Sequence, residues 1–111
     1  MLIVRSVEVY RNDALAGILT EENDRQYTFR YNAQYFTDPS TQPISLTLPK
    51  TSKEYKAANL FPFFYNMLSE GVNRKLQCRV LRIDEEDDFG LLAATAQYDT
   101  IGAVTVKPIT I

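Results

Sequence analysis

The first third of the chain alternates apolar and polar residues, and this period of two predicts β-strands. The predicted strands cover residues 2–10, 14–20 and 26–31, and short polar turns separate them. In the third strand Tyr27, Phe29 and Tyr31 share one side. We expect the three segments to pair as an antiparallel meander, with a turn at residues 11–13 and Gly17 as a candidate bulge position.

Two further strands are predicted downstream. Ile44, Leu46 and Leu48 alternate with polar residues and the run stops at Pro49, so residues 44–48 are predicted as the fourth strand. A fifth strand is predicted at residues 103–107, between a glycine and a proline. Residues 32–43 are predicted as a loop with one helical turn near 33–36, and residues 50–56 as a polar, exposed segment.

The most aromatic segment, Asn59–Gly71, has the sequence NLFPFFYNMLSEG and predicts a helix. Phe61, Phe64 and Leu68 recur at helical spacing, which predicts a side that faces the core. Asn59 is a candidate N-cap, and Gly71 can adopt the left-handed conformation that closes a helix.

Other sides of this helix are also rich in contact-forming side chains. We interpret five of them as candidate partner-binding residues: Phe63, Tyr65, Asn66, Ser69 and Glu70. A single core cannot cover aromatic groups on every side of one helix, so some are expected to meet another protein. The alternative, that the helix serves only the core, stays open at this point.

Two more helices are predicted at residues 72–83 and 89–96, the latter capped by Asp87 or Asp88. In the first, Val72, Leu76, Val80 and Ile83 are expected to face the core. Lys75, Arg79 and Arg82 are expected to form a solvated face, and contact with nucleic acid is the alternative. The whole pattern predicts one α+β domain over residues 1–111.

Composition and charge narrow the functional classes. The formal net charge is −2, and 45% of the residues are hydrophobic, as in a soluble globular domain. This balance gives no global attraction to phosphate backbones or anionic membranes. The start of the chain does not read as a signal peptide, and Cys78 is the single cysteine, so a reducing, cytoplasmic setting is expected.

Catalytic and metal-binding motifs are absent from the sequence. The chain has no histidine, no phosphate-binding glycine loop and no dinucleotide fingerprint. Cys78 is expected to be a packing residue. The acidic run at 84–88 lacks the alternating ligands of a calcium loop and is interpreted as a solvated capping segment. We therefore predict a protein that is not an enzyme and that uses no cofactor and no metal.

Six segments together resemble, in order and spacing, the N-terminal subdomain of the HipA family of bacterial toxin kinases. They are AGIL at 16–19, YTFRYNAQYF at 27–36, PISLTLP at 43–49, FFYNMLSEG at 63–71, FGLLA at 89–93 and DTIGAVTVKP at 99–108. Ser69 and Gln97 depart from the family pattern, where proline and glycine stand.

The resemblance implies a small antiparallel, barrel-like sheet of about five strands with two to three short helices. It also implies a free-standing, HipS-like subdomain that acts as antitoxin to a separate HipA/HipT-like kinase core, with a DNA-binding HipB-like protein as a further candidate partner in the same complex. No catalytic residue of the kinase core has a counterpart here. The alternatives are a structural subunit that completes a split kinase without inhibiting it, or a nucleic-acid-binding module.

Overall fold

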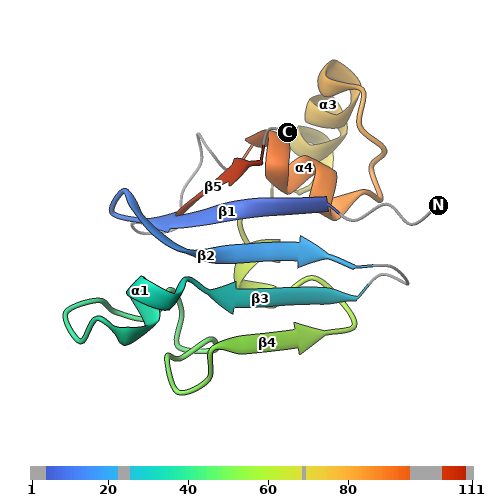
Figure 1. Ribbon diagram of the computed structural model, residues 1–111. Helices are drawn as coiled ribbons and strands as arrows, with labels where there is room; N and C mark the ends of the chain where they lie inside the picture. The colour runs from blue at the N-terminus through green and yellow to red at the C-terminus, as the bar shows by residue number, and fades with distance from the viewer. Residues whose placement is uncertain (1–4, 23–25, 69, 96–103, 110–111) are drawn as a thin grey trace.

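One antiparallel sheet organises the chain. The computed structural model describes residues 5–22, 26–68, 70–95 and 104–109. The strands are β1 (Arg5–Arg11), β2 (Ala14–Glu21), β3 (Tyr27–Tyr31), β4 (Glu54–Ala57) and β5 (Val104–Pro108), in the spatial order β4-β3-β2-β1-β5. The described helices are α1 (Ala33–Thr37), α2 (Pro62–Tyr65), α3 (Gly71–Leu81) and α4 (Asp88–Thr95) (Figure 1). The predicted α+β class with a five-stranded antiparallel sheet is confirmed.

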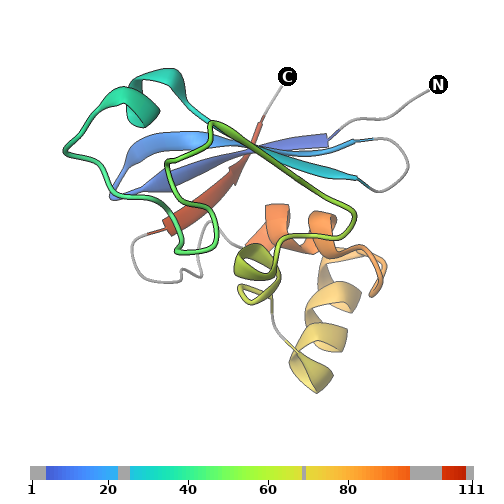
Figure 2. The same ribbon diagram turned by 90° about the horizontal axis from the view of Figure 1, so that it is seen from below.

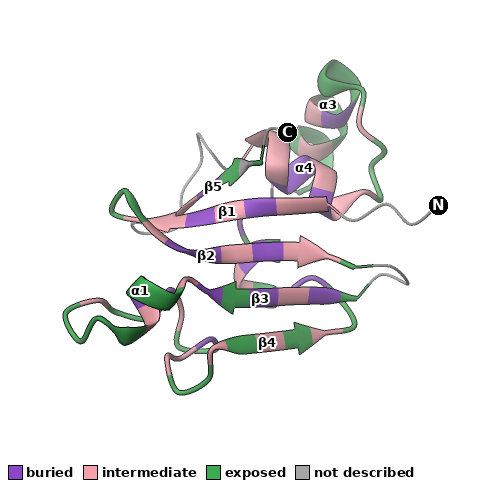
Figure 3. Cartoon of the chain, viewed as in Figure 1, coloured by how far each residue is buried: buried purple, intermediate pink, exposed green. Residues whose placement is uncertain are grey.

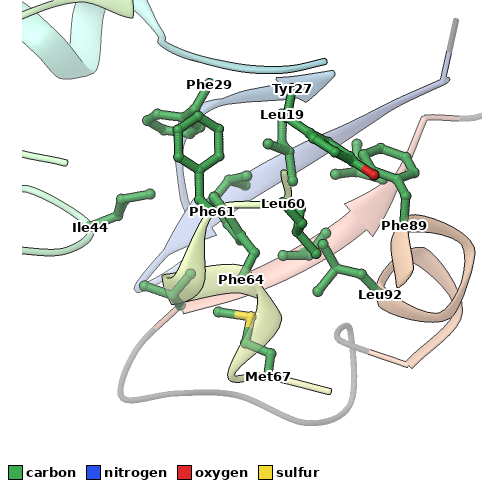
Figure 4. Close-up of a cluster of buried hydrophobic side chains, with 14 of the residues drawn as sticks. Leu19, Tyr27, Phe29, Ile44, Leu60, Phe61, Phe64, Met67, Phe89 and Leu92 are labelled. Carbon is green, nitrogen blue, oxygen red and sulfur yellow. The ribbon is translucent and has the colours of Figure 1, made fainter. Parts of the chain in front are cut away.

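The core lies between one face of the sheet and the helices that gather on it. Figure 2 shows α2, α3 and α4 on the same side of the sheet, with α1 apart from them. Alternate residues of the strands are buried, as a period of two requires. The side chains that meet in this core include Leu19, Tyr27 and Phe29 from the sheet, Leu60, Phe61, Phe64 and Met67 from the α2 segment, and Phe89 and Leu92 from α4 (Figure 4).

The β1–β2 hairpin follows from its turn residues. Asn12 and Asp13 have φ values of 51° and 67°, as a two-residue turn of type I′ requires. The strand register shifts between Val9, which lies opposite Gly17, and Tyr10, which lies opposite Leu15, so the bulge falls at Ala16, next to the predicted position Gly17. A Cβ atom at Gly17 would collide with the Arg30 carbonyl oxygen and the Phe29 ring, so this close approach of β2 and β3 requires glycine.

The prediction of a fourth strand at residues 44–48 is wrong. These residues form a turn in which the Leu48 amide donates to the Ser45 carbonyl at 3.1 Å. Ile44 and Leu48 are buried, but Leu46 between them is 96% exposed. The turn therefore places Leu46 opposite its two apolar neighbours, which a regular strand cannot do.

The true fourth strand is β4, which begins inside the segment 50–56 that the sequence predicts to be polar and exposed. Its Glu54 and Lys56 side chains are exposed, and Tyr55 and Ala57 are partly buried against the core. A charged strand suits the edge of a sheet, because charge discourages pairing with other chains. Because β4 has so few apolar residues, the pattern of hydrophobic positions did not predict this strand.

The helix predicted over 59–71 is shorter and begins later. α2 has Phe61 at its N-cap and Pro62 in its first turn, and Asn59 is not the cap. Turns continue the segment to Leu68, so the predicted core positions Phe61, Phe64 and Leu68 are all buried. Gly71 does adopt the left-handed conformation, with φ of 60°, but it begins α3 rather than closing α2.

The face of α3 that was predicted to be in the core points to solvent instead. Val72, Leu76 and Val80 are 79%, 56% and 74% exposed, whereas Cys78 on the other side of the helix is buried. Figure 3 shows α3 as largely exposed. The prediction fails because α2 and α4 already supply the apolar side chains that cover this part of the sheet. Cys78 is a packing residue, as expected.

An ionic cluster joins the sheet to the start of α4. The Arg5 guanidinium donates to Glu21 at 2.6 and 2.8 Å and to the two oxygens of Asp87 at 2.8 and 3.0 Å, and it lies 5.2 Å from the centre of the Phe89 ring. Asp87 also accepts the Gly90 amide at 3.0 Å, so of the two predicted candidates, Asp87 and Asp88, it is Asp87 that caps α4.

Asp87→Asn is expected to lower stability at neutral pH by about 1 kcal/mol, since asparagine keeps the cap but loses the ion pair. The hydrogen bond from Arg5 holds the pKa of Asp87 below its ordinary value of 3.8. A lowered carboxyl pKa stabilises the fold above the ordinary value, and this contribution is lost as pH falls through the folded pKa. Thermal melts from pH 7 to pH 2 should therefore show the variant and the wild type converging at acid pH. A constant difference would contradict the ion-pair explanation.

Candidate partner-binding site

The predicted partner-binding residues lie where α2 ends and α3 begins. Tyr65, at the last position of α2, is 43% exposed, and Asn66 and Glu70 are exposed as well. Ser69 lies outside the described residues. This corner presents an aromatic ring, an amide and a carboxylate to solvent.

Phe63 differs from the other predicted residues because it is half-buried. Its ring packs edge-on against Phe64, with 5.3 Å between the ring centres, and it rests on the core cluster. Truncating Phe63 would therefore disturb packing as well as any contact with a partner. Tyr65 is the better candidate for an aromatic anchor that stands outside the core.

A groove of about 440 Å³ opens beside Tyr65. Its lining consists of Tyr65, Leu68, Glu70, Gly71, Arg74, Glu85, Glu86 and Asp88. The structure thus brings Tyr65 and Glu70 to one groove, whereas Phe63 and Asn66 are not part of this lining. The other wall is formed by Glu85, Glu86 and Asp88 of the acidic run at 84–88, which also caps α4.

Arg74 joins the two walls of this groove. Its Nε and Nη2 atoms donate to the Glu85 carbonyl at 3.1 and 2.6 Å, and Nη2 also pairs with the Asp88 carboxylate. Burial works against the Arg74 charge, but the hydrogen bond and charge of Asp88 outweigh it, so the pKa of Arg74 is raised. The groove is therefore held in shape by a charged link, with Tyr65 and Glu70 at its rim.

The structure adds surface residues that the sequence pattern assigned to the core. Val72, Leu76 and Val80 lie exposed along the outside of α3. The sequence does carry a signal for this exposure. The stripe has only one apolar residue per turn, with Lys75 and Arg79 beside it, and so it is narrower than the apolar face of a helix that packs on a core.

Within the ranges that the structure describes, no group of three or more His, Cys, Asp or Glu side chains could hold a metal ion. None of the helices in the same ranges is long and apolar enough to cross a bilayer. What the described surface offers is a groove and an apolar stripe, which are features of protein–protein contact.

Comparison with known proteins points to one family. The sequence matches the family model described as the HipA N-terminal domain over residues 7–107. It is similar to a putative kinase, Y4mE, from Sinorhizobium fredii, with 27% identity over 96% of this chain. It is also similar to an uncharacterized protein of Haemophilus influenzae, with 30% identity over 95% of this chain and 93% of that protein.

The structural comparison agrees with the sequence comparison. The fold matches a solved structure of the N-terminal domain of HipA toxin with a TM-score of 0.74 and 26% identity, over 97% of this chain and 95% of that one. The chain spans only about a quarter of the length of the Sinorhizobium kinase (25%), and so the similarity covers one part of that protein.

Proposed function

Because this chain belongs to the HipA N-terminal domain family, we propose that it is a non-catalytic, antitoxin-like subunit that binds and restrains a separate HipA/HipT-like Ser/Thr kinase core. The observation that carries the proposal is the family match over residues 7–107, within a domain that makes up only a quarter of the similar kinase. The Haemophilus relative, 93% of which is covered, supports the existence of this domain in proteins of similar length.

Binding as a separate chain places demands on the surface. A subdomain that is covalently joined to a kinase core has a high effective concentration, whereas a separate one must hold its partner by its own contacts. Such contacts usually centre on an aromatic anchor that loses its water on binding. Tyr65, beside the groove and outside the core, fits this requirement.

The test uses the kinase-core protein of this family from the organism that carries the chain. We expect calorimetry to show one-to-one binding, and we expect phosphate transfer by the kinase core to fall as this chain is added. Binding without loss of kinase activity would favour the alternative of a structural subunit that completes a split kinase. Absence of binding at micromolar concentrations would reject the proposal.

Tyr65→Ala is expected to weaken this binding by about 1–3 kcal/mol, or roughly 5- to 150-fold, because a central aromatic anchor would be removed. The melting temperature should stay within about a degree of the wild type, since surface substitutions usually change stability little. Tyr65→Phe is the matched control, because it keeps the ring and should keep most of the affinity. If Tyr65→Ala lowers affinity and melting temperature together, the side chain serves the fold and not the interface.

A further inference from the structure

The outer edge of β4 is an unpaired end of the sheet. In the spatial order β4-β3-β2-β1-β5, β4 has a neighbouring strand on one side only among the described residues. Figure 1 shows β4 at one end of the sheet and β5 at the other. An unpaired edge presents backbone N–H and C=O groups with which a further strand can pair.

The backbone groups at this edge belong to Glu54 and Lys56. The Tyr31 amide donates to the Lys53 carbonyl oxygen at 2.8 Å, so Tyr55, two places further along β4, also directs its backbone groups to β3. The residues on either side of Tyr55 point the other way, because hydrogen-bonded and non-bonded pairs alternate along an antiparallel ladder. The N–H and C=O groups of Glu54 and Lys56 therefore face outward.

The same two residues carry opposite charges. Both side chains are exposed on β4, Lys56 at 70% and Glu54 at 43%. Within one chain their charged atoms lie 3.9 Å apart, which is a long contact for an ion pair. Exposed pairs of this kind contribute little, so each charge gains from a closer partner across the edge.

The β4 strand of a second copy supplies those partners in one register. If two β4 strands lie antiparallel about a two-fold axis through Tyr55, Glu54 of each copy lies opposite Lys56 of the other. Each copy then donates two outward N–H groups and accepts two, so that four backbone hydrogen bonds and two Glu–Lys pairs join the strands. The Glu54 carbonyl oxygen already accepts the Ser52 hydroxyl at 3.0 Å, and its second lone pair can accept the new bond.

Other two-fold registers are worse. An axis through Glu54 places the two Glu54 side chains opposite each other, and an axis through Lys56 does the same with two lysines, and like charges directly opposite destabilise a strand pair. An axis between two residues matches outward-facing with inward-facing backbone groups, so no regular ladder forms. The charges that discourage pairing with unrelated strands thus favour a second copy, in a single register.

We propose that two copies of this protein pair through β4, antiparallel about a two-fold axis at Tyr55, and so join their five-stranded sheets into one. The dimer is weak, because two short strands form a small interface. Dimerisation through β4 goes beyond the proposed function and does not depend on it, since the groove beside Tyr65 is lined by residues outside β4.

Sedimentation equilibrium of the purified chain over a concentration series measures the dimerisation. We expect the wild type to dimerise, and we expect Glu54→Lys and Lys56→Glu each to weaken dimerisation at least about 5-fold, because each replaces two opposite-charge pairs by two like-charge pairs. A mixture of the two single variants should regain the association, since every lysine then lies opposite a glutamate. The variant that carries both substitutions should dimerise like the wild type for the same reason.

Lys107→Glu is the matched control, because it makes the same change of charge at an exposed lysine of β5, at the other end of the sheet. It should leave dimerisation unaltered. In hydrogen exchange, the amides of Glu54 and Lys56 should exchange more slowly as the protein concentration rises. The amide of Tyr55, which already faces β3, should not change.

The outcomes decide for or against the β4 dimer. A chain that stays monomeric up to about 1 mM would overturn it. It would also be overturned by dimerisation that the single charge variants leave unaltered or that mixing them fails to restore. Dimerisation that is lost only in Lys107→Glu would assign the contact to β5. The kinase core takes no part in these measurements, so their failure leaves the proposed function standing.

Discussion

Phe64→Ala is expected to cost about 3–5 kcal/mol of folding free energy, because it removes a fully buried ring from the centre of the core. The ring centre of Phe64 lies 6.0 Å from that of Phe29 on β3, 6.3 Å from that of Phe61 and 5.3 Å from that of Phe63. Figure 4 shows Phe64 between the sheet and the turn that carries Met67. The total stability of a domain is about 5–15 kcal/mol, so this loss is a large fraction of it.

Urea unfolding of Phe64→Ala and of Phe64→Leu provides the measurement. Leucine fills more of the space, so Phe64→Leu should cost clearly less than Phe64→Ala. A variant with alanine at the neighbouring Tyr65 should unfold like the wild type. A loss below about 1 kcal/mol for Phe64→Ala would mean that the α2 segment does not anchor the core.

Tyr31→Phe is expected to destabilise the protein by about 2–4 kcal/mol, although it removes a single oxygen atom. The buried Tyr31 hydroxyl accepts the Ile44 amide at 3.2 Å and donates to the Leu48 carbonyl oxygen. Burial raises the pKa of Tyr31 to about 12, so the hydroxyl keeps the proton that it donates. Phenylalanine would leave two buried backbone groups without their partner.

Tyr10→Phe is the matched control for Tyr31→Phe. The Tyr10 hydroxyl donates to the Glu8 side chain at 3.2 Å on the partly exposed part of β1, so its loss should cost little. Amide hydrogen exchange of residues 44–48 should accelerate in Tyr31→Phe and stay unchanged in Tyr10→Phe. Equal stability of the two variants would show that Tyr31 does not hold the 44–48 turn.

Local pattern predicted those parts of the fold that local forces determine. The meander followed from alternation and from the turn residues Asn12 and Asp13, and the Asp87 cap followed from its position before an apolar run. Residues 44–48 also alternate, but the long-range bonds from Tyr31 close them into a turn. The alternation of apolar and polar residues carries no information about this tertiary contact, and so the pattern predicted a strand.

The sequence pattern likewise predicted only part of the candidate site. Sequence pattern separated Tyr65 from the core-facing Phe61 and Phe64, and the structure agrees that Tyr65 is partly exposed. The sequence pattern could not show that the apolar side of α3 has no neighbour among the described residues, because amphipathicity indicates that a helix face is apolar and not what packs against it. Half-burial of Phe63 likewise depends on packing around Phe64.

The pairing of β1 with β5 bears on how the protein is made. Val7 lies opposite Pro108, and Arg11 lies opposite Val104, so the first of the described strands pairs with the last of them. Hairpins among β1, β2 and β3 can form early, since their loops are short, but β1 keeps one bare edge until β5 has also left the ribosome. Closing so long a loop is slow compared with forming a hairpin. In the growing chain, that edge is therefore the surface most exposed to wrong pairing, and arrival of β5 is the step that ends the exposure.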